Sequence, residues 1–89
     1  MEIEYNAHPP EDDTSHIISM LLMSRPQHQF NIEALIREMP GCEIPGNDDK
    51  GRTIVVVEAE TNKQLVQRMT QIQDLEHLVS SSLVFHQIA

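Results

Sequence analysis

The chain has 89 residues, of which 39% are hydrophobic and 22% charged, a balance typical of one soluble globular domain with a modest core. The formal charge of −8 and the 3% of aromatic residues argue against nucleic-acid binding, which requires a basic surface. No segment is apolar for long enough for membrane insertion, and the first residues are acidic rather than basic, so we expect a cytoplasmic protein without a signal peptide. The single cysteine, Cys42, excludes an intramolecular disulfide and a cysteine-based metal site.

The first fifteen residues differ in composition from the rest of the chain. They contain Pro9-Pro10 and the acidic run Glu11-Asp12-Asp13. We therefore predict a flexible acidic tail over residues 1–15 and a single folded domain over residues 16–89.

The folded part begins with a strand and a helix. Residues 16–24 are predicted to be a strand, because the run from Ile17 to Met23 is apolar on both faces. A helix follows, since Pro26 suits a first helical turn and an apolar stripe recurs at helical spacing. That stripe comprises Ile32, Leu35, Ile36 and Met39, with Phe30 as an extension. Pro40-Gly41 ends the helix.

Two further strands flank a polar turn at residues 45–51. Cys42-Glu43-Ile44 is predicted to be a short strand, and Pro45 places it at a sheet edge because proline cannot donate to a ladder. Residues 52–60 have the strongest strand pattern of the chain, with β-branched side chains on both faces.

A second helix and a fourth strand complete the domain. Thr61 is predicted to cap the helix, with Gln64 completing a capping box. The buried stripe of this helix comprises Leu65, Val66, Met69 and Ile72, with Leu75 near its end. Residues 78–87 are predicted to be the fourth strand.

This order of elements predicts an α+β ferredoxin-like fold, βαββαβ. Right-handed crossovers give a four-stranded antiparallel sheet of strand order 4-1-3-2 with both helices on one face. Because two helices cover only one face, the other face must meet water, a second copy or a partner. This indicates a binding protein rather than an enzyme.

Alternation along each strand assigns side chains to this open face or to the core. Because carboxylates are rarely buried unpaired, Glu58 and Glu60 define the open side of the third strand. That side carries Ile54, Val56, Glu58 and Glu60, and the core side carries Thr53, Val55, Val57 and Ala59. On the first strand we expect His16, Ile18, Met20 and Leu22 to face out, with Ile17, Ser19, Leu21 and Met23 inside. On the fourth strand we expect Leu78, Ser80, Ser82, Val84 and His86 to face out, with Val79, Ser81, Leu83 and Phe85 inside.

The predicted open face combines a polar cluster with an apolar patch. The cluster contains His16, Glu58, Glu60 and His86, and the patch contains Ile18, Met20, Leu22, Ile54, Val56 and Val84. Such a surface suits a peptide with a hydrophobic segment beside clustered arginines, because arginine pairs bidentately with carboxylates. A metal site is disfavoured because its ligands would come from three strands with no local spacing signature. Catalysis is disfavoured because nothing marks a nucleophile, a phosphate loop or a paired-acid site, so we expect no cofactor.

Two alternatives stay open. Two copies could stack their sheets face to face and bury the same patch, giving a homodimer. A small regulatory ferredoxin-like domain could instead bind a metabolite, and it would have no preference for paired arginines in a peptide.

Three segments resemble the NapD family. They are Pro40-Gly41-Cys42-Glu43-Ile44, Gly51-Arg52-Thr53-Ile54-Val55-Val56-Val57-Glu58-Ala59-Glu60 and Ser82-Leu83-Val84-Phe85-His86-Gln87. With His16-Ile17, which is similar as well, the resemblance spans roughly residues 16–87. It implies a cytoplasmic chaperone without a cofactor, which binds the twin-arginine signal peptide of the catalytic subunit of periplasmic nitrate reductase. It also implies that the chaperone holds the precursor back from export until the molybdenum cofactor has been inserted.

Overall fold

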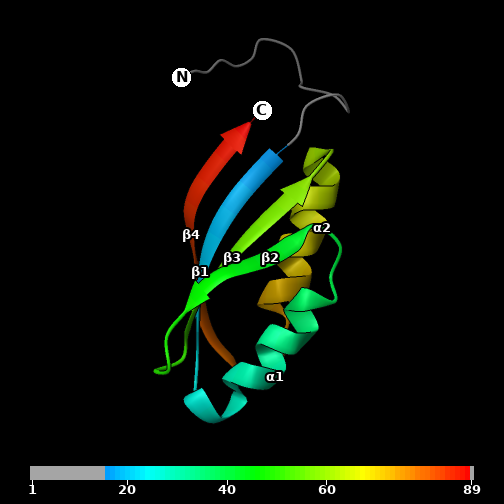
Figure 1. Ribbon diagram of the computed structural model, residues 1–89. Coiled ribbons are helices and arrows are strands. Elements are labelled where there is room, and N and C mark those ends of the chain that lie inside the picture. Colours follow the sequence, from blue (N-terminus) through cyan, green and yellow to red (C-terminus); the bar gives the residue numbers. More distant parts are fainter. Residues whose placement is uncertain (1–15, 89) are drawn as a thin grey trace.

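The structure, a computed structural model, describes residues 16–88 and, for residues 86–88, the backbone alone. The predicted tail at residues 1–15 lies outside the described residues. The elements are β1 (His16–Ser24), α1 (Pro26–Arg37), β2 (Cys42–Asn47), β3 (Arg52–Ala59), α2 (Asn62–Gln73) and β4 (Leu78–Ile88). They form one antiparallel sheet of order β2-β3-β1-β4 with both helices against one face (Figure 1), which confirms the predicted fold.

Both helices begin where the sequence predicts. Pro26 occupies the first turn of α1, where its missing N–H costs no hydrogen bond. Thr61 caps α2, because its side chain accepts a hydrogen bond from the Gln64 N–H at 3.1 Å. The side-chain oxygen of Gln64 accepts from the N–H of Glu60 at 3.2 Å, one residue before the donor that a capping box would use.

The helices bury fewer apolar side chains than their stripes predict. Ile32 and Ile36 of α1 are buried, whereas Leu35 and Phe30 are exposed. On α2, Leu65 and Ile72 are buried and Val66 is exposed. Met69, and Leu75 just after the helix, pack against the core. Each helix therefore meets the sheet through a narrow row of side chains one or two turns apart.

The prediction for the side chains of β3 is confirmed. Thr53, Val55, Val57 and Ala59 are buried under the helices. Ile54 and Val56 are half-buried on the other face, and Glu58 is exposed there. Glu60 is also exposed, immediately beyond the end of β3.

The prediction for β1 is wrong. His16, Ile18, Met20 and Leu22 were expected on the open face, but they are only 1–2% exposed and lie on the helix side. Ile17, Ser19 and Leu21 are half-buried and Met23 is exposed, so these four occupy the open face. Both sides of β1 are apolar, and Ser19 decides the orientation. Its hydroxyl stays on the face that reaches solvent, while the adaptable thioether of Met20 fills the core.

Two register irregularities change the orientation of β4. Ser19 pairs with Phe85 and the next residue, Met20, pairs with Leu83, so Val84 is an extra residue in β4. Val79 is a second extra residue, between the partners of Met23 and Ser24. An inserted residue reverses the alternation of a strand. Phe85 therefore lies on the open face at 50% exposure, and not in the core as expected.

The same irregularities correct other predictions for β4. Leu78 packs against the core instead of facing out. Val79 was expected inside but is exposed. Leu83 pairs with the helix-facing Met20, which is its predicted side, yet it is exposed on this edge strand. The backbone of His86 pairs with Ile18, and its side chain, which was expected to face out, lies outside the described part. The serines Ser80 and Ser82 pair with open-face residues, as predicted.

A buried polar network joins α1 to the β2–β3 hairpin. Glu33, only 5% exposed, accepts hydrogen bonds from the Thr53 hydroxyl at 2.8 Å and from the Asn47 amide at 2.9 Å. The Gln29 amide donates to the same carboxylate at 3.1 Å, and the Arg37 guanidinium lies 3.7 Å away. Burial raises the pKa of the Glu33 carboxyl, but the hydrogen bonds outweigh burial and hold this pKa below its ordinary value.

Candidate functional site

The open face, the side of the sheet away from the helices, carries rows of side chains that cross the strands. In register order these rows are Glu58 with Ile17; Glu43 with Val56, Ser19 and Phe85; Ile54 with Leu21 and Ser82; and Arg52 with Met23 and Ser80. The centre of the face is therefore apolar, and its β2–β3 side is acidic.

Five apolar side chains surround Ser19 in the middle of the open face, and we call them the apolar strip. They are Ile17, Leu21, Ile54, Val56 and Phe85. The first four are half-buried by their neighbours and Phe85 is exposed, so all of them retain surface for a ligand. Burying apolar surface is worth roughly 25 cal/mol per Å², so a ligand with an apolar side gains affinity on this strip.

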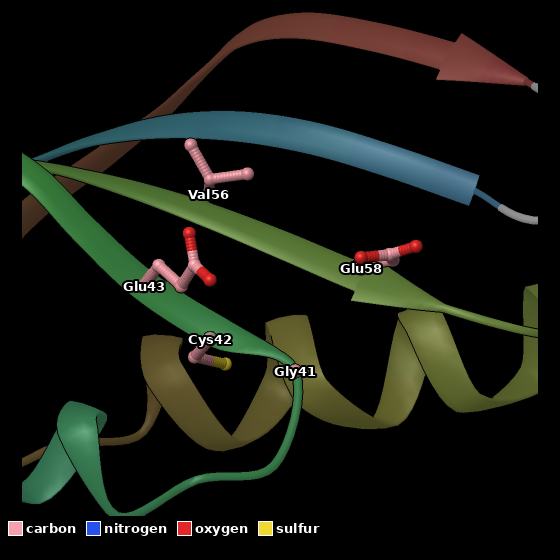
Figure 2. A pocket seen from close by; sticks show the side chains of 5 residues that line it. All are labelled: Gly41, Cys42, Glu43, Val56 and Glu58. Atoms are coloured by element: carbon pink, nitrogen blue, oxygen red, sulfur yellow. The ribbon is translucent and has the colours of Figure 1, made fainter.

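A depression of about 150 Å³ adjoins the apolar strip. It is lined by Gly41, Cys42, Glu43, Val56 and Glu58, which come from β2, β3 and the residue before β2 (Figure 2). In Figure 2 the side chains of Glu43 and Val56 point away from α2, whereas Cys42 points toward the helix side.

Gly41 explains why the depression exists. Its carbonyl accepts the N–H of Glu58 at 2.8 Å, so the position beside Glu58 on β3 carries no side chain. The backbone of Gly41 has φ +77°, and an added Cβ would collide with the carbonyl oxygen of Glu58 and the guanidinium of Arg68. Glycine is required here both by the conformation and by the space.

The two carboxylates at the depression lie close together in the register. Glu43 is the direct partner of Val56, and Glu58 lies two residues further along β3 on the same face. Such diagonal neighbours are about 7–8 Å apart. Within residues 16–88, neither carboxylate takes part in an ion pair or accepts a hydrogen bond. Arg68 donates instead to the backbone carbonyl of Glu58. The two acids are therefore available to an external cation.

Other chemistry has little support in the described part of the chain. Burial raises the pKa of the Cys42 thiol, which disfavours the reactive thiolate. No group of three or more His, Cys, Asp or Glu side chains within residues 16–88 is placed to hold a metal ion. None of the helices described has the length and apolar character needed to cross a membrane.

Comparisons with known proteins agree with this fold. The family model described as NapD protein matches residues 15–89. The chain belongs to the NapD family. The chaperone NapD of Escherichia coli is 32% identical over 72 residues, which cover 80% of this chain and 83% of that relative. The chaperone NapD of Haemophilus influenzae is 25% identical over 73 residues, or 81% of this chain and 78% of the relative.

A solved structure is similar as well. It is the solution structure of the E. coli Tat proofreading chaperone protein NapD, with a TM-score of 0.76 and 31% sequence identity, covering 82% of this chain and 78% of the other. The predicted family and fold are thus confirmed. Because NapD proteins are chaperones, the prediction that the chain is not an enzyme is confirmed too.

The structure gathers only part of the predicted site of this chain. Ile54, Val56 and Glu58 lie together on the open face, with Glu60 just past the end of β3. Val84 is exposed but has no partner in the register. The remaining predicted residues do not join them: His16, Ile18, Met20 and Leu22 lie on the helix side, and the side chain of His86 is outside the described part.

Sequence reasoning missed Glu43 and Phe85. Glu43 could have been found, because an antiparallel partner of β3 must place one of Cys42 and Glu43 on the open face, and the acid is the one that avoids the core. Phe85 carried no such signal, because its orientation depends on the inserted residue Val84.

Proposed function

We propose that this NapD-family chain is a cytoplasmic chaperone for the catalytic subunit of periplasmic nitrate reductase. It binds the twin-arginine signal peptide of the precursor and delays export until the molybdenum cofactor has been inserted. The observation that carries the proposal is the juxtaposition, on the sheet face opposite the two helices, of an apolar strip with the carboxylates of Glu43 and Glu58, which have no ion-pair or hydrogen-bond partner within residues 16–88. The names of the relatives, which are NapD chaperones, support it.

The chemistry of the face matches a peptide that is basic at one point and apolar beside it. A guanidinium presents its N–H groups in a planar fork, which fits a carboxylate with two parallel hydrogen bonds. Glu43 and Glu58 would take the arginines, and Glu60 would extend the acidic side. The neighbouring hydrophobic part of the signal peptide would lie on the strip around Val56 and Ile54. The overall charge of −8 attracts such a peptide and repels acidic ones.

The sheet face suits this ligand better than the β2 edge. Pro45 lies within β2 and removes a backbone donor there, and the β2–β3 register is irregular between Glu43 and Gly46. An added strand would therefore pair poorly with β2. A peptide helix can instead lay its apolar side on the strip and place its arginines at the depression.

Titration calorimetry tests the proposal. The full-length protein is titrated with a nitrate reductase twin-arginine signal peptide and with the same peptide carrying lysine in place of both arginines. We expect binding of the first and a loss of affinity of about tenfold or more for the second, because lysine cannot form the bidentate pair. Equal affinity for both peptides would contradict an arginine-specific acidic site. Failure of both to bind would overturn the proposed function.

A further inference from the structure

The two edges of the sheet differ in their protection. β2 carries Pro45, the exposed acid Glu43 and an irregular register. These are features by which proteins prevent an edge from pairing with another strand. β4, the opposite edge, has eleven residues, and its sequence LVSSSLVFHQI contains no Asp, Glu, Lys, Arg, Pro or Gly. The pairing of β4 with β1 is interrupted as well, at Val79 and Val84, so the two edges differ in charge and proline content and not in regularity.

Exposed apolar side chains gather on the same strand. Val79, Leu83, Val84 and Phe85 are half of the eight large hydrophobic residues that are exposed in the described part of the chain. Val84 is 60% exposed although it lies near the middle of the strand. An uncharged apolar edge of this kind favours a partner strand of the same character.

We propose that β4 is the interface with a second copy of this chain, formed by antiparallel pairing of β4 with β4. The absence of Asp, Glu, Lys and Arg from β4 favours a second copy of the chain as the partner. The chain holds 14 acidic and 6 basic residues, yet none of them lies in β4, so two copies meet there without burying a charge. A basic peptide would find no acidic partner on this strand, whereas a second β4 carries no Asp, Glu, Lys or Arg and presents exposed apolar side chains of its own. The proposal does not depend on the signal peptide.

Antiparallel pairing of identical strands fixes the symmetry of the assembly. The two-fold axis stands perpendicular to the sheet, which gives one continuous eight-stranded sheet with both helix layers on the same side. Pairing over the whole length of β4 places the axis at its central residue, Leu83, and makes the two Val84 side chains near neighbours. The acidic depression lies at β2 and β3, at the far side of each sheet, so both copies keep it uncovered.

A pair of charge variants tests the interface. Sedimentation equilibrium of the full chain should show a dimer that dissociates on dilution. Val84→Lys and Val84→Glu should each weaken self-association by about tenfold or more, because like charges meet near the axis, while an equimolar mixture of the two should associate again. Val66→Lys is the matched control, since Val66 is an exposed valine on α2 at 51% exposure and should leave the dimer unchanged.

Thermal melting of each variant distinguishes a lost interface from a lost fold, and recovery in the mixture does so independently. A wild-type chain that stays monomeric up to sub-millimolar concentration overturns the proposal. So does an equal loss of association in Val66→Lys, which would place the interface elsewhere. Amide exchange adds a further test: protection of the β4 amides should increase with protein concentration. Protection that is independent of concentration would indicate an occupant from the same chain and would also overturn the proposal.

Discussion

The Thr53 hydroxyl on β3 donates to the Oε2 atom of Glu33 on α1 at 2.8 Å, so a buried carboxylate anchors the helix to the strand. Asn47, at the end of β2, donates to both oxygens of the same carboxylate at 2.9 Å. α1 is thereby tied to both strands of the hairpin whose outer face presents Glu43 and Glu58. The polar network on the helix side thus supports the strands that form the acidic depression.

Replacing Glu33 should destabilise the fold strongly. Glu33→Ala leaves the buried Thr53 hydroxyl and the exposed Asn47 amide without this acceptor, while the buried Gln29 amide keeps the carbonyl of Asp48. A buried donor that loses its acceptor is costly. We expect a loss of about 2–4 kcal/mol in the free energy of unfolding. Urea denaturation measures it. Glu76→Ala, at an exposed acid after α2, should change stability by less than about 0.5 kcal/mol. Similar losses in the two variants would contradict a specific role of the network.

Acid should weaken the same anchor. Hydrogen bonds hold the pKa of folded Glu33 below its ordinary value of 4.5, despite burial. A carboxyl group whose pKa is lower in the folded than in the unfolded protein stabilises the fold at pH values above its unfolded pKa. This stabilisation is lost as the pH falls through the folded pKa. The stability advantage of the wild type over Glu33→Gln should therefore be constant near neutrality and shrink below about pH 4.5. Thermal melting from about pH 7 to pH 3 checks this, and a gap that does not narrow would contradict it.

Asp48 should stay ionised at unusually low pH. Its carboxylate accepts the N–H groups of Arg52 and Lys50 in the hairpin turn, and it pairs with the Arg52 side chain at 2.6 Å. These hydrogen bonds, first of all the one from the Arg52 backbone, lower the pKa of Asp48 to about 2. Proton titration by NMR should therefore find Asp48 still ionised at pH values where ordinary aspartates are protonated. In Arg52→Ala the pKa of Asp48 should rise, because the side-chain partner is lost. An unchanged pKa would assign the shift to the backbone donors alone.

The acidic pair should govern affinity and not stability. Glu43→Gln with Glu58→Gln should weaken binding of the twin-arginine peptide by about tenfold or more, while the melting temperature stays nearly unchanged. The control is Glu38→Gln with Glu76→Gln, which changes the net charge equally at exposed sites away from the sheet face. The loss of affinity caused by replacing Glu43 and Glu58 should be smaller for the lysine-substituted peptide, because that peptide lacks the bidentate contact. An equal loss of affinity in both double variants would show that the net charge of the protein, and not the position of Glu43 and Glu58, governs peptide binding.

Adjacent valines on β3 should respond oppositely to an acid. Val57 is fully buried under the helices, so Val57→Asp should prevent folding by placing an unpaired carboxylate in the core. Val56 lies half-buried on the open face, so Val56→Asp should fold but should disrupt the apolar strip and weaken peptide binding. Circular dichroism and calorimetry distinguish the two outcomes. Unfolding of both variants would mean that the open face is not exposed in solution.

The orientation of side chains on a strand could be predicted where polar residues clearly indicated which of its two faces is exposed. On β3, Glu58 and Glu60 fixed the alternation, and the assignment was correct. On β1, Ser19 was the one polar mark within an apolar run and indicated the correct open face, but the prediction placed it inside. On β4, the inserted residue Val84 reversed the alternation, and an insertion becomes visible only when the partner strand is known. Glu33 escaped notice because its partners Asn47 and Thr53 lie 14 and 20 residues away.

Gly41 should be needed for both the fold and the depression. Gly41→Ala puts a Cβ on a residue with φ +77°, against the Glu58 carbonyl and the Arg68 guanidinium. We expect a loss of about 1–3 kcal/mol in the free energy of unfolding, since a non-glycine residue is strained in this region. Peptide affinity should fall as well, because the displaced Glu58 backbone carries one of the two acids. Gly46→Ala is the control in β2, the strand that follows Gly41: nothing lies within 4 Å of the added Cβ, so stability and affinity should both be nearly unchanged. Chemical denaturation and calorimetry of the two variants together decide the point. Equal effects would show that any added methyl group in β2 is harmful, and that the left-handed turn at Gly41 has no special role in presenting Glu58.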